Sequence, residues 1–186
     1  ALVAELNARG PSLAVYWGNR NWHPLLPDTL QQMADDGIRR ALAFVTSAFA
    51  SYSGCRQYRE DLEQARLAVG PDAPEIHKLR LFYNHPGFIE PMAERVAAAL
   101  AQLGESRRSE ARIIYTAHSL PEAMARNCAY EAQIREAARL VSDRLRWSHW
   151  EVAYQSRSGP PAQPWLEPDV GRRLRELAEA GHTEPV

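Results

Sequence analysis

Cysteine, lysine and long apolar runs are all scarce in this sequence of 186 residues. The two cysteines, Cys55 and Cys128, are too few for a disulfide framework and cannot alone complete a four-ligand zinc or iron–sulfur site. We therefore expect two free thiols. Lys78 is the only lysine among 22 basic residues. Genomic base composition or anion recognition would each explain this bias, and we favour base composition.

The sequence also lacks membrane and targeting signals. No apolar run approaches the roughly 18 residues of a membrane-spanning helix, and the first residues do not form the basic, apolar and small-residue pattern of a signal peptide. These absences predict a cytoplasmic protein without stable membrane insertion. The 22 basic and 23 acidic side chains leave a formal charge of -1, which gives no overall attraction to a nucleic-acid backbone. We predict no nucleic-acid partner.

Several catalytic signatures are missing as well. The sequence contains no G-x-S-x-G nucleophile motif, no G-x-x-x-x-G-K-[ST] phosphate loop and no G-x-G-x-x-G that opens a helix. Its six histidines and two cysteines do not show the spacing of a zinc site. These absences argue against the familiar hydrolases, nucleotide hydrolases and dinucleotide-dependent enzymes.

Short β-rich runs alternate with longer amphipathic stretches along the chain. The predicted strands are residues 13–17, 39–46, 76–82, 112–116 and 152–155. The predicted helices are residues 29–36, 56–69, 88–103, 131–145 and a last helix from the N-cap Asp169 to about Ala180. The continuous apolar run 41–45 predicts a strand covered on both faces. This order predicts an α/β fold, a three-layer, doubly wound parallel sheet with functional loops at the carboxyl ends of the strands.

Both ends of this pattern are abrupt. Residues 1–6 resemble the end of a helix that no strand precedes, and the pattern calls for another strand after Gly181. We therefore expect a fold that is incomplete at both termini, as in a piece of a longer protein.

Polar and aromatic residues concentrate in three segments that follow predicted strands. In residues 16–24, aromatic rings alternate with amide groups and Arg20, a mixture that can stack on a flat ligand and bind its carboxylates. Alternatively, this loop simply packs under helix ends, with Trp22 as a hydrophobic plug.

The other two segments follow the last two predicted strands. In residues 115–121, the neutral imidazole of His118 offers a nitrogen lone pair that can act as a base or a metal ligand. A structural, hydrogen-bonded histidine is the alternative. In residues 154–169, prolines and a glycine form a compact turn that Trp165 is expected to anchor to the core, and a rigid connection accounts for most of this segment.

Taken together, these segments resemble the ferrochelatases. The matching blocks are residues 18–24 (GNRNWHP), 116–121 (TAHSLP), 154–161 (YQSRSGPP) and 164–169 (PWLEPD), in the family's order and separation. The resemblance covers essentially the whole chain and is closest to the bacterial branch that acts on coproporphyrin III, particularly its actinobacterial members. It implies a chelatase-like, Rossmann-like fold in which residues 1–186 form the central part, the end of one Rossmann-like half and most of the second.

The resemblance implies an enzyme that inserts Fe²⁺ into a porphyrin, coproporphyrin III or protoporphyrin IX, in heme biosynthesis. By resemblance, His118 binds the metal or receives a proton. Tyr83, Arg20 and Ser53 are assigned to substrate binding, with Tyr83 lining the porphyrin site and Arg20 in the cleft wall. Ala48 occupies a position where some members have a histidine.

The implied partners are the porphyrin and Fe²⁺, and no cofactor beyond this substrate metal is expected. A [2Fe–2S] cluster is not expected, because its remaining ligands lie largely in a C-terminal extension of other members. The family's N-terminal porphyrin clamp and an acidic block expected after Gly181 are not in the sequence, so we expect little or no activity from this chain alone. The alternatives are a non-enzymatic tetrapyrrole-binding module, a related chelatase for another tetrapyrrole or metal, and a structural interaction domain.

Overall fold

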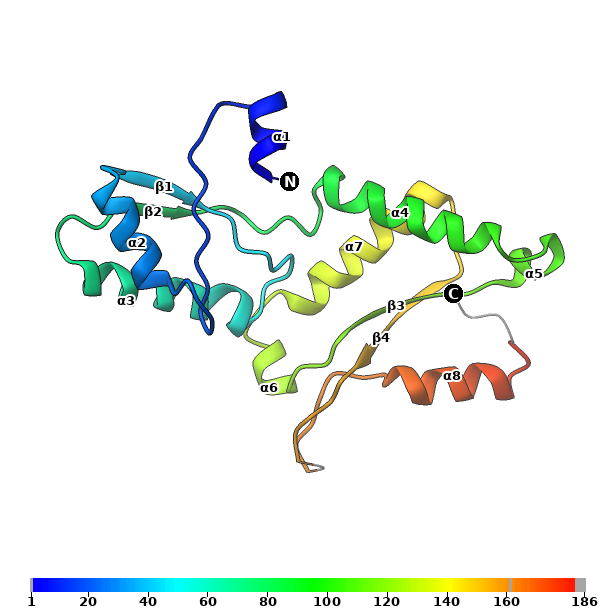
Figure 1. Ribbon diagram of the computed structural model, residues 1–186. Coiled ribbons are helices and arrows are strands. Elements are labelled where there is room, and N and C mark those ends of the chain that lie inside the picture. The colour runs from blue at the N-terminus through cyan, green and yellow to red at the C-terminus, as the bar shows by residue number, and fades with distance from the viewer. Residues whose placement is uncertain (1, 161, 183–186) are drawn as a thin grey trace. The chain divides into compact units, whose positions relative to one another are not determined.

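The computed structural model describes residues 2–160 and 162–182, with the side chain of Ser53 outside the described part. The chain divides into two compact units (Figure 1). Unit 1 comprises residues 2–45 and 56–79, and unit 2 comprises residues 46–55 and the described residues from 80 onward. Each unit contains a two-stranded parallel sheet. The α/β class with parallel strands is confirmed, and the strands lie in two sheets.

Unit 1 packs two helices against its sheet. Its elements are α1 (Leu2–Arg9), α2 (Leu26–Asp35), β1 (Arg40–Ala43), α3 (Gln57–Val69) and β2 (Glu75–Lys78). Leu30 and Met33 of α2 and Ala65 of α3 form a buried cluster against Ala41 and Ile76 of the sheet. The helices and strands predicted from residue 29 to residue 82 are confirmed, although both strands are shorter than predicted.

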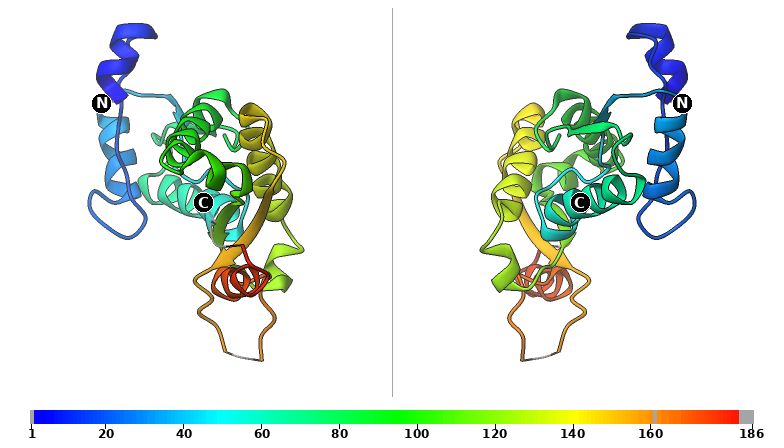
Figure 2. Two further views of the ribbon diagram at one scale, coloured as in Figure 1. Left: turned by 90° about the vertical axis from the view of Figure 1, so that its right-hand side faces the viewer. Right: turned by 90° about the vertical axis from the view of Figure 1, so that its left-hand side faces the viewer.

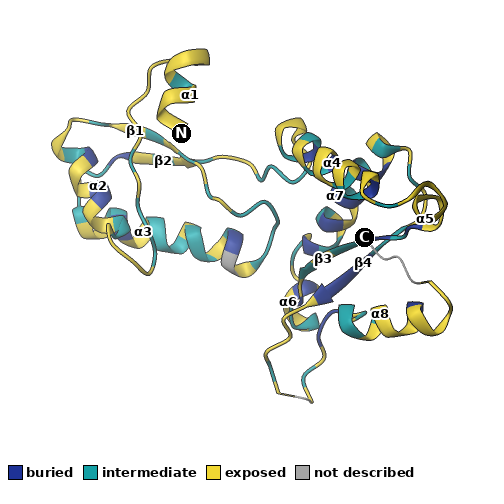
Figure 3. Cartoon of the chain, turned by 45° about the vertical axis from the view of Figure 1, so that its right-hand side comes forward, coloured by how far each residue is buried: buried dark blue, intermediate teal, exposed yellow. Residues whose placement is uncertain are grey.

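The prediction that β1 is covered on both faces is wrong. Ala41 points to the helices, whereas Leu42 is 64% exposed and Phe44, just beyond the strand, is 56% exposed. Successive side chains of a strand point to opposite faces, and α2 and α3 supply apolar side chains to one of them. Figure 3 shows the resulting alternation of exposed and intermediate residues in β1.

The strand predicted over residues 13–17 is also wrong, because this segment has no strand partner among the described residues. Leu13 and Trp17 are more than half exposed. The carbonyl of Trp17 instead accepts a hydrogen bond of 3.0 Å from the hydroxyl of Thr29 in α2. A β-rich run becomes a strand only where a neighbouring chain pairs with its backbone.

Unit 2 contains most of the chain's helices. Its elements are α4 (Pro86–Ala101), α5 (Glu105–Glu110), β3 (Ile113–His118), α6 (Glu122–Ala125), α7 (Tyr130–Leu145), β4 (Trp150–Gln155) and α8 (Val170–Glu179). A π-helical segment, η1 (Tyr52–Arg56), lies where the chain passes from unit 2 into unit 1. The strands predicted here are confirmed, as are the three long helices, and α8 begins at the predicted N-cap, where Asp169 Oδ1 accepts from the Arg172 amide at 2.9 Å.

Helices cover both faces of the sheet in unit 2. Strands β3 and β4 pair in parallel from Ile113 opposite Trp150 to His118 opposite Gln155. Both α7 and α8 pack against β4, with α4 and α7 on one side and α8 on the other (Figures 1 and 2). Ala153 is therefore fully buried between the two layers. This is the predicted helix, sheet, helix arrangement.

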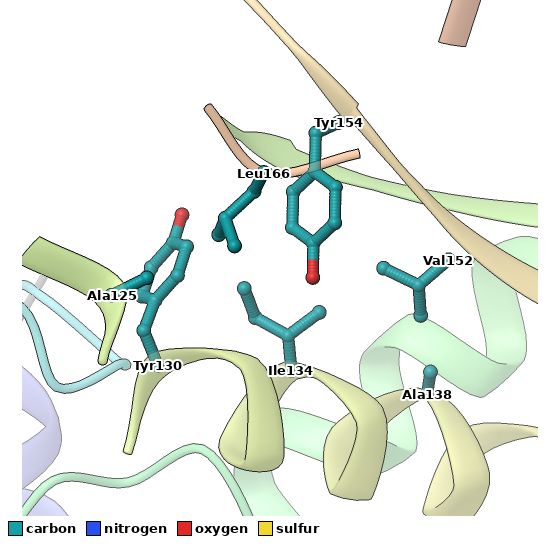
Figure 4. Close-up of a cluster of buried hydrophobic side chains, with 7 residues drawn as sticks. All are labelled: Ala125, Tyr130, Ile134, Ala138, Val152, Tyr154 and Leu166. Carbon is teal, nitrogen blue, oxygen red and sulfur yellow. The ribbon is translucent and has the colours of Figure 1, made fainter. Parts of the chain in front are cut away.

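The core of unit 2 follows the apolar stripe of α7. Ile134 and Ala138, four residues apart, face Val152 and Tyr154 of β4, and Leu166 closes one end of the cluster (Figure 4). Val152 and Tyr154 share a face because they are two residues apart on a strand. This packing fixes β4, and through it β3, against the helix.

Candidate active site

His118 is the last residue of β3, at the carboxyl edge of the sheet in unit 2. Its side chain is exposed, while the two strands that carry and support it run through the core. The sheet therefore presents an imidazole at its rim, where the nitrogen lone pair is accessible to a proton or a metal ion.

The backbone around His118 is held from several directions. The hydroxyl of Tyr130 donates to the carbonyl oxygen of His118 at 2.9 Å. The next amide, of Ser119, donates to the carbonyl of Gln155 at 2.7 Å, and the Ser119 hydroxyl donates to the carbonyl of Leu166 at 3.0 Å. An exposed side chain thus stands on a peptide whose oxygen and amide are both bonded, an arrangement that limits how far the imidazole can move.

The segment after β4 is tied to the same place. The amide of Leu166 donates to the carbonyl of Leu120, and Trp165 forms an antiparallel bridge with Pro121. Trp165 is 8% exposed, so the predicted anchor is confirmed. Its ring lies so close to Gly159 that a Cβ there would approach within 2.6 Å. Pro161, in the same segment, lies outside the described residues.

A small cavity of about 130 Å³ is lined in part by Ser119, the residue that follows His118 in the sequence. Its lining residues come from the ends of β3 and β4 and from the segment before α8: Ser119, Tyr154, Gln155, Arg157, Leu166, Glu167 and Asp169. Sites for small organic ligands usually occupy about 300–1,000 Å³. This cavity is large enough for only a few water molecules and is too small for a tetrapyrrole, so we assign no substrate to it.

Two tyrosines of this region hold their protons more tightly than exposed tyrosines do. Burial, with a contribution from Cys128, raises the pKa of the Tyr130 phenol, which therefore keeps its proton in neutral and mildly alkaline solution. Burial and the nearby Glu131 carboxylate raise the pKa of Tyr154 to about 12.

The predicted substrate-binding residues lie in both units. Tyr83, in unit 2 with His118, is half-buried in a turn that the His85 amide closes by donating to the Phe82 carbonyl at 2.9 Å. Arg20 lies in unit 1, where its Nε is 2.6 Å from Asp61 Oδ2 and its guanidinium lies 5.2 Å from the centre of the Tyr58 ring. Arg20 Nε and Asp61 Oδ2 are both buried, and their geometry does not meet the criteria for a hydrogen bond.

Ser53 belongs to η1, and its side chain lies outside the described residues. The neighbouring Gly54 is buried, and a Cβ on it would approach within 2.4 Å of the Ser47 hydroxyl. The Gly54 amide donates to the Ser51 hydroxyl at 2.9 Å. The segment that carries Ser53 is thus folded closely on residues 47–51.

Neither Cys55 nor Cys128 is in a disulfide, as predicted. Among the described residues, no group of three or more His, Cys, Asp or Glu side chains is arranged to hold a metal ion. No helix in the described ranges is long and apolar enough to cross a membrane.

The ferrochelatase family model matches residues 1–186. The chain belongs to the ferrochelatase family. It is 52% identical to a ferrochelatase of Rhodopirellula baltica over all of this chain and 53% of that protein. It is 55% identical to the coproporphyrin III ferrochelatase of Frankia alni, over 97% of this chain and 50% of that protein. With the coproporphyrin III ferrochelatase of Mycolicibacterium smegmatis, the identity is 52% over 97% of this chain and 54% of that protein.

The chain spans about half the length of these ferrochelatases. The family predicted from the sequence blocks is confirmed. Sequence reasoning missed two residues that contact the predicted site residues: Tyr130, whose hydroxyl donates to the His118 carbonyl, and Asp61, which pairs with Arg20. The spacing of Tyr58 and Asp61, three residues apart, places them on one face of α3 and was the available signal.

Proposed function

We propose that this chain is part of an enzyme that inserts Fe²⁺ into a porphyrin, coproporphyrin III or protoporphyrin IX, in heme biosynthesis. The family membership supports this proposal, as do the printed names of the relatives, two of which are coproporphyrin III ferrochelatases. The observation that carries it is the exposed imidazole of His118 on a rigid peptide at the sheet's carboxyl edge.

The reaction explains the need for such a residue. Two pyrrole protons leave the macrocycle, and the hydrated Fe²⁺ sheds water as four ring nitrogens replace it. In our proposal, His118 accepts a pyrrole proton or binds the arriving iron, since a neutral imidazole suits both tasks. Its fixed backbone keeps the point from which the imidazole projects in one place while the two substrates meet.

The other roles are proposals of the same kind. Tyr83 lines the porphyrin site, and Ser53 binds the substrate. Arg20 contributes to the cleft wall; within unit 1, Asp61 neutralises part of its charge and Tyr58 supports its guanidinium. In this assignment, unit 1 belongs to the end of one Rossmann-like half, and unit 2 forms most of the second.

The test is anaerobic incubation of the full-length protein with Fe²⁺ and coproporphyrin III, followed by the change in visible absorption. We expect insertion by the wild type and a loss of about 100-fold or more in kcat for His118→Ala. The matched control is His149→Ala, because His149 is also exposed but lies just before β4, at the opposite edge of the same sheet.

Three results would contradict the proposal. If His118→Ala inserts iron at the wild-type rate, His118 is not needed for the reaction. Porphyrin binding without insertion by the wild type indicates a tetrapyrrole-binding module. Faster turnover of sirohydrochlorin or Co²⁺ than of a porphyrin and Fe²⁺ indicates a related chelatase.

A further inference from the structure

Tyr130 is the residue that links α7 to the end of β3. It is the first residue of α7 and is 8% exposed. Its hydroxyl reaches back 12 residues along the chain to the carbonyl oxygen of His118, at 2.9 Å. In Figure 4 its ring rises from α7 on the same side as Ile134, toward the segment that carries Leu166.

The ring of Tyr130 has little freedom. It packs in the buried cluster that includes Ala125, Ile134 and Leu166. The ring of Phe49 meets it edge-on, with 6.3 Å between ring centres and 83° between planes, and Phe49 is itself held in the same way by Phe88. The hydroxyl therefore occupies a defined position, because aromatic pairs of this geometry add to the apolar packing.

The peptide between His118 and Ser119 is consequently fixed at both of its polar groups. Tyr130 bonds its oxygen, and the carbonyl of Gln155 accepts from its amide. Rotation of this peptide would turn the Cα–Cβ bond of His118 and move the imidazole. His118 is the last residue of β3, so beyond it the peptide is held by these two hydrogen bonds.

We propose that Tyr130 is a positioning residue for His118: its hydroxyl holds the peptide after His118 so that the exposed imidazole keeps the orientation that iron insertion needs. This inference rests on the proposed function of His118. Tyr130 does not touch the reacting atoms in this mechanism and acts only through the peptide that it holds.

The test compares two tyrosines of unit 2 that each lose only a hydroxyl. Tyr130→Phe removes the hydrogen bond to His118 and keeps the ring. Tyr115→Phe is the matched control. Tyr115 is on the same strand as His118, three residues before it, and its hydroxyl lies 2.9 Å from the Ser142 hydroxyl instead of bonding the His118 peptide. Both phenols are partly buried and have a raised pKa caused first by burial.

In the full-length protein, we expect Tyr130→Phe to lower kcat by about 10- to 100-fold, as the loss of outer support does for other metal sites. The KM for coproporphyrin III should stay within about twofold, and Tyr115→Phe should leave both constants within about twofold. A spectroscopic readout that needs no turnover is the NMR signal of the His118 ring. We expect one signal in the wild type and in Tyr115→Phe, and a broadened or doubled signal in Tyr130→Phe.

The outcomes separate this inference from the proposed function. If His118→Ala is inactive but Tyr130→Phe keeps its kcat and a single ring signal, Tyr130 does not position His118 and the proposed function stands. Equal losses in Tyr130→Phe and Tyr115→Phe also overturn the inference, because they indicate a general loss of stability. If His118→Ala inserts iron at the wild-type rate, both proposals fail.

Discussion

At the scale of single residues, burial determines how the polar groups of unit 2 behave. Tyr154 is 1% exposed, and its hydroxyl donates to Glu131 Oε2 at 3.3 Å. A phenolate in this place would lose its hydration and would face a carboxylate. Such a group links the stability of the fold to pH in a range where exposed tyrosines would not.

The first prediction concerns Tyr154 at alkaline pH. The pKa of about 12 lies above the ordinary value of 10.0, so the folded state holds the proton more tightly than the unfolded chain does. This contribution is fully present below pH 10 and is lost as the pH rises toward 12. We expect it to amount to roughly 2 kcal/mol.

Urea unfolding at pH 9 and at pH 11.5 measures this effect. The wild type should lose more stability between the two pH values than Tyr154→Phe does. The phenols of Tyr115 and Tyr130 have raised pKa values as well, so some loss should remain in the variant. An identical loss in both proteins would show that Tyr154 is not the group responsible.

A second prediction concerns Gly54, beside the proposed substrate residue Ser53. A methyl group on Gly54 would lie 2.4 Å from the Ser47 hydroxyl and 3.1 Å from the carbonyl of Phe49. Gly54→Ala should therefore lower the free energy of unfolding by about 1–3 kcal/mol, as overpacking does elsewhere. Thermal or urea unfolding measures the loss.

Ser47→Gly provides the control for this clash, because it removes the nearer obstacle and leaves the Phe49 carbonyl. In the Ser47→Gly background, Gly54→Ala should cost less than it does alone. Additive effects of the two substitutions would indicate that the clash with Ser47 is not the cause.

At the scale of elements, the first turns of α7 support two segments at once. Tyr130 holds the end of β3, and Gln133, three residues on, accepts a hydrogen bond of 2.6 Å from the Ala50 amide. Phe49 packs against Tyr130 between these two contacts. One helix end thus supports both His118 and the segment that leads into η1.

This arrangement predicts different kinetic effects for neighbouring positions. Gln133→Leu removes the acceptor for Ala50 and should loosen the segment that carries Ser53, raising the KM for coproporphyrin III by about 3- to 10-fold with little change in kcat. Gln133→Glu keeps an acceptor and should retain the wild-type KM. Equal KM values for the two variants would show that the hydrogen bond from the Ala50 amide to Gln133 does not support the segment that carries Ser53.

The elements also show what local sequence can predict. The helices α3, α4 and α7 were predictable because their apolar residues recur on one face, and α8 because Asp169 is a typical N-cap and Gly181 a typical stop. The strands β3 and β4 were predictable because each contains a short β-rich stretch. Whether helices pack on one or both faces of β1 was not predictable, because an apolar run does not reveal which distant helices reach each face. His118 was found through its sequence block, whereas Tyr130 was missed because only the folded chain brings its hydroxyl to residue 118.

At the scale of the whole molecule, each unit has its own sheet and its own buried cluster. In unit 1 the cluster contains Leu30, Met33 and Ala65. In unit 2 one cluster includes Val141 of α7, which is fully buried and packs with residues of α4. Separate cores allow separate cooperative unfolding, because the amides of each sheet are protected by the packing of that unit.

Val141→Ala tests this separation by opening a cavity in unit 2 alone. The substitution should lower the stability of unit 2 by about 2 kcal/mol. Hydrogen exchange should then accelerate by about 30-fold at the protected amides of β3 and β4. The amides of β1 and β2 should keep their wild-type rates, since none of the contacts that protect them has changed. Equal acceleration in both sheets would instead mean that the two units unfold as one, and that a substitution in either would disturb Arg20 and His118 together.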